Sequence, residues 1–170
     1  MMSGMTVKSE TTESQANLLC KACGLCCTGH LFTWTKLRAA EMDSIEALGV
    51  RVVRSIPSQR GFNQPCPLWK GQCTIYETEQ YPRFCRTYKC KLLKELLEES
   101  TSLPHALTLI EQAKEEILDL EALLPPSENP NFRERLVAEL EVNEDPSFRK
   151  KVKDLLMMYE KVFGVRDVIE

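Results

Sequence analysis

Eight cysteines lie between residues 20 and 90, and none lies in the eighty residues that follow. They are Cys20, Cys23, Cys26, Cys27, Cys66, Cys73, Cys85 and Cys90. This density is typical of a disulfide scaffold or of a metal site, and the redox compartment separates the two, because thiols stay reduced in the cytosol. The first nineteen residues are rich in Ser, Thr and Glu and lack the apolar segment of a secretory signal. We therefore expect a cytoplasmic protein whose cysteines bind metal.

The closest spacing is Cys20-x2-Cys23-x2-Cys26, which predicts three sulfurs within one compact turn. The same spacing opens the bacterial ferredoxin motif, whose fourth cysteine is followed by proline. In this chain Cys66 is the next distant cysteine, and Pro67 follows it. The side chains of adjacent residues diverge, so we expect Cys26 and Cys27 to face different partners, or one of them not to bind the metal directly.

All eight cysteines are candidate metal ligands. Two four-thiolate sites would use every cysteine, and one cluster with a labile pair is the alternative. Zinc and an iron–sulfur cluster both accept four thiolates, so the ligand type does not choose between them. His30 could complete a Cys3His site, although a surface or capping role is commoner for such a histidine. Buried reduced thiols, or disulfides in an exported protein, are explanations to which we give less weight.

The formal net charge of −3 conceals an asymmetry. Residues 20–94 contain twelve Lys and Arg against five Asp and Glu, whereas residues 95–170 contain nine against eighteen. Basic segments often bind nucleic acid. However, four thiolates around a divalent metal leave a charge of −2, which nearby cations would offset. We favour this role over nucleic-acid binding for the five basic residues that flank the cysteines: Lys21, Arg83, Arg86, Lys89 and Lys91.

Punctuation along the chain predicts three parts: a flexible lead over residues 1–19, a cysteine-cluster metal-binding module over 20–95 and an acidic helical tail over 96–170. In the module we expect a tight turn at 20–27, a helix at 33–48, a short strand at 50–56, a loop at 57–65, a hairpin-like turn at 66–76 and a helix at 90–99.

The tail carries stronger signals. The spacing of apolar residues predicts a helix over residues 102–124, which Pro125-Pro126 ends. Asn129-Pro130 and Asp145-Pro146 each predict the start of a further helix, and the last one stops at Gly164. The predicted fold class is mainly α, with a small irregular α+β metal–thiolate module and a helical C-terminal tail. Eight of the twelve aromatic residues lie between residues 32 and 88, where we expect them to form core rather than platforms for stacking bases.

The complete pattern resembles a known family. The matching residues are Cys20, Cys23, Gly24, Cys26, Cys27, Cys66, Pro67, Leu68, Cys73, Ile75, Tyr76, Pro82, Cys85, Arg86, Tyr88 and Cys90. Together they resemble the family of zinc- or iron-chelating cysteine-cluster domains, the CxxCxxCC family, over about residues 20–90. Tyr81-Pro82 departs from the usual Arg-Pro before the Cys-Arg element. The resemblance implies metal chelation through the cysteines.

These observations predict a metal-binding protein whose cofactor is an iron–sulfur cluster or zinc, with electron transfer as one role. We place iron–sulfur ahead of zinc because of the ferredoxin-like triplet and Cys66-Pro67. The alternatives are a zinc-stapled module whose acidic helices bind a protein partner and, less favoured, a cluster-assisted protein-modifying enzyme. No catalytic motif accompanies the cysteines, so we expect a binding protein rather than an enzyme. No run approaches the ~18 apolar residues of a membrane span, so we expect no membrane partner.

Overall fold

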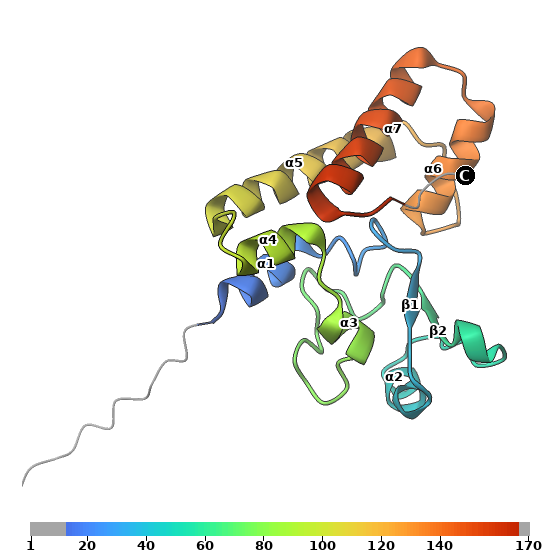
Figure 1. Ribbon diagram of the computed structural model, residues 1–170. Coiled ribbons are helices and arrows are strands. Elements are labelled where there is room, and N and C mark those ends of the chain that lie inside the picture. Colours follow the sequence, from blue (N-terminus) through green and yellow to red (C-terminus); the bar gives the residue numbers. More distant parts are fainter. Residues whose placement is uncertain (1–12, 167–170) are drawn as a thin grey trace, which may run out of the picture.

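The computed structural model describes residues 13–166 and confirms a mainly α fold with a small antiparallel sheet (Figure 1). The elements are α1 (Gln15–Cys23), β1 (Trp34–Lys36), the 3-10 turn η1 (Ala39–Glu41), α2 (Met42–Ala47), the 3-10 turn η2 (Pro57–Gln59), β2 (Gly61–Asn63), α3 (Arg83–Thr87), α4 (Lys91–Leu97), α5 (Leu103–Glu121), α6 (Phe132–Val142), α7 (Pro146–Met158) and the π-helical turn η3 (Tyr159–Phe163).

Figure 1 shows α5, α6 and α7 on one side of the molecule, α1 and α4 beneath α5, and the loop-rich part with α2, α3 and both strands on the other side. Helix α5 contacts both α7 and α1, and α1 also contacts α4. No helix among the described residues is long and apolar enough to cross a bilayer.

The tail helices confirm the predicted pattern because their signals are local, but the cap of α6 is Asn131 and not the predicted Asn129. Ser102, Asn131 and Asp145 each accept a backbone N–H bond at the start of α5, α6 and α7, which satisfies donors that have no partner inside the helix. The turn η3 continues α7, and Gly164 ends it in the left-handed conformation with φ of 72°.

The cysteine-rich segment differs from the prediction in three places. The first cysteines lie on helix α1, which ends at Cys23, rather than in a turn over residues 20–27. Only the second half of the predicted 33–48 helix is helical, because Trp34–Lys36 pairs as strand β1 with β2. The predicted strand at 50–56 contributes a single bridge, between Val53 and Gly61.

Two hydrophobic clusters hold the structure together. Cluster 1 is the larger one and joins α1 and α4 to α5, α6, α7 and η3, so it contains residues of both the cysteine-rich segment and the tail. Cluster 2 lies in the loop-rich part and consists of Leu37, Met42, Ile45, Val50, Phe62 and Ile75. Six cysteines pack against these clusters, with Cys20, Cys23, Cys26 and Cys90 against cluster 1 and Cys66 and Cys73 against cluster 2.

Candidate metal centre

Helix α1 carries the first two cysteines. Ser14 caps the helix by accepting the Asn17 N–H at 3.2 Å. Cys20 and Cys23 are three residues apart, so their side chains leave the same face of the helix. Gly24, with φ of 66°, then ends the helix in the left-handed conformation.

The next two cysteines occupy the tight turn after Gly24. The Thr28 hydroxyl donates to the Gly24 carbonyl at 2.9 Å, and the N–H groups of His30 and Leu31 donate to the Leu25 carbonyl. Within this turn Cys26 packs against cluster 1, whereas the Cys27 carbonyl accepts the N–H of Cys66 at 2.7 Å. The two neighbours therefore have different surroundings.

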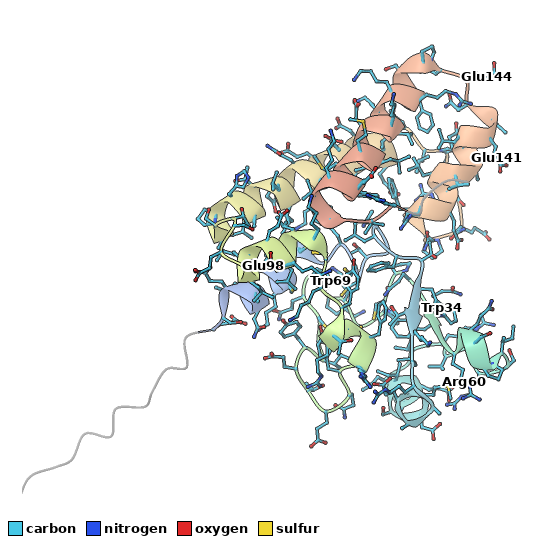
Figure 2. All side chains as sticks on the ribbon, in the orientation of Figure 1. Trp34, Arg60, Trp69, Glu98, Glu141 and Glu144 are labelled. Atoms are coloured by element: carbon cyan, nitrogen blue, oxygen red, sulfur yellow. The ribbon has the colours of Figure 1, made fainter. Side chains whose placement is uncertain are left out.

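Cys66 and Cys73 belong to a hairpin-like turn, as predicted for residues 66–76. Trp69 and Cys73 form an antiparallel bridge around Lys70 and Gly71. Both cysteines pack against cluster 2. The indole of Trp69 lies over Gly24, where an added Cβ would approach within 2.2 Å of its ring. Figure 2 shows Trp69 in the middle of the molecule, at the junction of the helical and loop-rich parts.

The last two cysteines flank a short connection. Cys85 lies on α3, and its carbonyl accepts the Tyr81 hydroxyl at 3.2 Å. Cys90 is the N-cap of α4, where its sulfur accepts the Leu93 N–H at 3.5 Å. Cys90 thus faces α1 from the start of the helix that packs beside it.

All eight cysteines are free thiols, and seven of them line one cavity of about 100 Å³. Cys66 is the one that does not. Apolar and aromatic side chains make up most of the remaining wall, including Leu92, Ile110 and Phe163 of cluster 1. Seven of the eight cysteines therefore border one mostly apolar cavity that is partly open to solvent.

The electrostatics of the cysteines follow from this burial. Burial raises the pKa of every cysteine thiol, to about 11 for Cys20 and about 12 for Cys23 and Cys85. Neighbouring cysteines raise several of these pKa values further, because a second thiolate nearby would repel the first. Without metal the thiols are therefore neutral at pH 7.

The donor set fits zinc or an iron–sulfur cluster, because clustered thiolates are the ligands both prefer. As they stand, however, no three or more His, Cys, Asp or Glu side chains within residues 13–166 form a group that could hold a metal ion. Metal loading would thus have to draw the sulfurs closer together.

His30 lies on the side of the turn that faces α6. Its ring is 5.0 Å from that of Phe132, and its Nδ1 is 2.7 Å from the Thr28 hydroxyl. Burial lowers the pKa of His30 from 6.5 to about 4, so the ring is neutral at pH 7. These contacts give His30 a packing role.

Two basic residues outside the five that the sequence singled out act on the thiols. Lys114 lowers the pKa of Cys23, and Lys94 that of Cys90, by favouring the thiolates. Lys114 comes from α5 and donates to the Ala22 carbonyl at the end of α1, at 2.8 Å. Lys114 lies 24 residues beyond the last cysteine, so no local sequence pattern indicated that it would lie near the thiols.

Two of the five flanking cations contact aromatic rings. Lys21 pairs with Glu13 and lies over the Tyr76 ring, 5.1 Å from its centroid. Arg86 lies 5.7 Å from the Tyr81 ring centroid.

The aromatic residues of this segment pack against one another, although of the eight predicted to form core only Phe62 is buried and the others are half-buried. The rings of Phe32 and Tyr88 meet edge to face at 4.7 Å, Phe84 stacks on Tyr88 at 5.9 Å, and Tyr76 lies 5.1 Å from Tyr81. Such pairs stabilise beyond the area that they bury. Most of these rings also line the cavity, so the aromatic packing and the sulfurs share one region.

The chain is mainly helical, and seven of its free thiols border one cavity, a donor set suited to binding metal through cysteines. A family model described as "CxxCxxCC: Putative zinc- or iron-chelating domain" matches residues 19–115. The match covers more than half of the chain and reaches from α1 into α5. The chain therefore belongs to this family. No curated protein and no solved structure matches it.

Proposed function

We propose that this protein binds an iron–sulfur cluster through its cysteines and transfers electrons. The observation that carries the proposal is the mostly apolar cavity lined by seven free cysteines. Membership of a zinc- or iron-chelating family supports a metal cofactor. An apolar shell supports the redox role, because exclusion of water and hydrogen bonds to the sulfurs set the potential of such a cluster.

The chain's own contribution is to hold and orient the thiols. Helix α1 presents Cys20 and Cys23 together, and the cap of α4 fixes Cys90 with a backbone N–H on its sulfur. Each ligand loses its proton on binding, and the cations Lys94 and Lys114 favour the thiolate form. A bound cluster would accept or donate one electron at a time. The reducing cytoplasm, where we place the protein, would keep the thiols free.

Anaerobic purification of the full-length chain tests this function. We expect brown protein that contains iron and acid-labile sulfide and whose colour bleaches on reduction. A variant with Cys20→Ser and Cys85→Ser should be colourless, whereas Ser3→Ala, outside the described residues, should keep its colour.

Colourless protein with stoichiometric zinc would instead support a zinc-stapled module that binds a protein partner through its acidic helices. Protein with neither metal would overturn metal binding altogether.

A further inference from the structure

Four of the cysteines lie on or beside α1 and α4, although within residues 13–166 they do not yet form a group that could hold a metal ion. Cys20 and Cys23 come from α1, Cys26 from the turn that follows, and Cys90 from the cap of α4. The two helices contact each other, and all four cysteines pack against cluster 1. We call these four cysteines the helical group.

The other four gather in the loop-rich part. The carbonyl of Cys27 accepts the Cys66 N–H at 2.7 Å, which ties the turn after α1 to the hairpin-like turn. Cys66 and Cys73 stand at the two ends of that turn and pack against cluster 2. Cys85 lies on α3, and its carbonyl accepts a hydrogen bond from the Tyr81 hydroxyl; the Tyr81 side chain packs against the same cluster. We call Cys27, Cys66, Cys73 and Cys85 the loop group.

The electrostatic neighbours of each thiol follow the same division. Cys90 raises the pKa of the Cys20 thiol, whereas Cys66 and Cys73 raise the pKa of the Cys85 thiol. The cross-group pairs are Cys26 with Cys27 and Cys23 with Cys27. The effect of Cys23 on Cys27 is weaker than those of Cys73, Cys85 and Cys66. The effect of Cys27 on Cys26 is weaker than those of Cys23 and Cys90, although stronger than that of Cys20. The boundary between the groups therefore falls at the peptide bond between residues 26 and 27.

We propose that the cysteines form two separate metal sites of four thiolates each, one made by the helical group and one by the loop group. The inference rests on the proposed function and adds how the ligands divide. Four sulfurs are the full complement that a zinc ion or an iron–sulfur cluster takes. Two groups of four also leave no cysteine over, which one cluster with a labile pair would not achieve.

Metal counting tests the division, with Zn²⁺ as the probe. The reduced full-length chain is loaded with excess Zn²⁺ under anaerobic conditions, freed of unbound metal and analysed for zinc per chain. We expect two zinc ions in the unaltered chain. One zinc ion would overturn the division while leaving metal binding intact, whereas no zinc, together with no iron in the protein as purified, would overturn the proposed function itself.

Paired substitutions then locate the two sites. Cys90→Ser keeps an N-cap oxygen for α4, so it removes a ligand without removing the cap. Cys90→Ser alone and Cys90→Ser with Cys20→Ser should each retain one zinc, because both changes fall within the helical group. Cys90→Ser with Cys85→Ser should retain none. Equal zinc contents in the two double variants would overturn the proposal.

Alkylation of the unaltered chain gives a readout that does not depend on how the variants fold. At increasing zinc, mass spectrometry of iodoacetamide-treated protein reports which thiols are protected. We expect Cys20, Cys23, Cys26 and Cys90 to gain protection together, and the other four to gain it together at a different zinc concentration or rate. Protection of Cys26 together with Cys66 and Cys73, ahead of Cys20, would overturn the division.

Discussion

At the scale of single residues, Gly24 and Trp69 connect the two parts of the molecule. Gly24 lies between Cys23 and Cys26, and Trp69 lies between Cys66 and Cys73. Gly24 needs its left-handed backbone to end α1, and the absence of a side chain lets the indole lie against it. The contact therefore fixes how the hairpin-like turn packs on the end of α1.

We expect Gly24→Ala to destabilise the protein by more than 2 kcal/mol, because the left-handed backbone costs ~1 kcal/mol with a side chain and the methyl group also collides with Trp69. Urea unfolding measures the change. Gly71→Ala is the matched control, since its φ of 80° carries the same strain but nothing lies within 4 Å of the new methyl group. Equal losses in the two variants would contradict the role of Trp69.

His30 makes stability depend on pH. Its pKa falls from 6.5 to about 4 on folding, so below pH 6.5 the unfolded chain takes up a proton that the folded chain does not. Unfolding free energy should therefore fall as the pH drops from about 6.5 to about 4, by about 2 kcal/mol between pH 7 and pH 5. Urea unfolding at both pH values checks this. The His30→Gln variant should lose this pH dependence of the unfolding free energy. His105→Gln is the control, because His105 is exposed, and it should keep the dependence. An unchanged pH dependence in His30→Gln would refute the assignment to His30.

At the scale of elements, the sequence predicted what local signals determine. Helices α5 to α7 follow from local signals, and the buried residues of α7 and η3 recur every three or four positions, as expected for one face of a helix: Phe148, Val152, Leu155, Tyr159 and Phe163. Strand β1 was missed because its partner, Gly61–Asn63, is distant in the sequence. The eight candidate ligands were evident from the sequence, but their grouping depends on α1 packing beside α4, which no local pattern encodes.

The contact between α5 and the end of α1 gives an element-level prediction. Lys114→Met removes both a cation near Cys23 and the hydrogen bond to the Ala22 carbonyl. Because the lysine is partly exposed, we expect the free energy of metal binding by the helical group to weaken by about 1 kcal/mol. This corresponds to roughly fivefold faster release of metal to a chelator. Lys151→Met, whose amine pairs with Asp119 instead, should leave the release rate unchanged. Similar acceleration in both variants would argue against a specific role for Lys114.

At the scale of the whole molecule, cluster 1 joins the helical group of cysteines to the tail helices. Ile110 of α5 is 1% exposed and lines the cavity together with the cysteines. The tail therefore forms one wall of the site, although it contains no cysteine.

We expect Ile110→Ala to lower the unfolding free energy by about 2–5 kcal/mol and to weaken metal retention, because it leaves a void beside the thiols. Denaturant unfolding and metal content measure the two effects. Leu118→Ala on the same helix, where the side chain is 67% exposed, should change stability by less than about 0.5 kcal/mol. Full metal content in Ile110→Ala would show that metal retention does not depend on packing by the tail.

The two cysteine groups are nested along the chain, since Cys27 to Cys85 lies wholly inside Cys20 to Cys90. A chain emerging from the ribosome would therefore expose the complete inner set first. The outer set must wait for Cys90 and then for α5 and η3, against which its surroundings pack. During synthesis the loop-rich part can therefore assemble before the helical part, which completes its packing last.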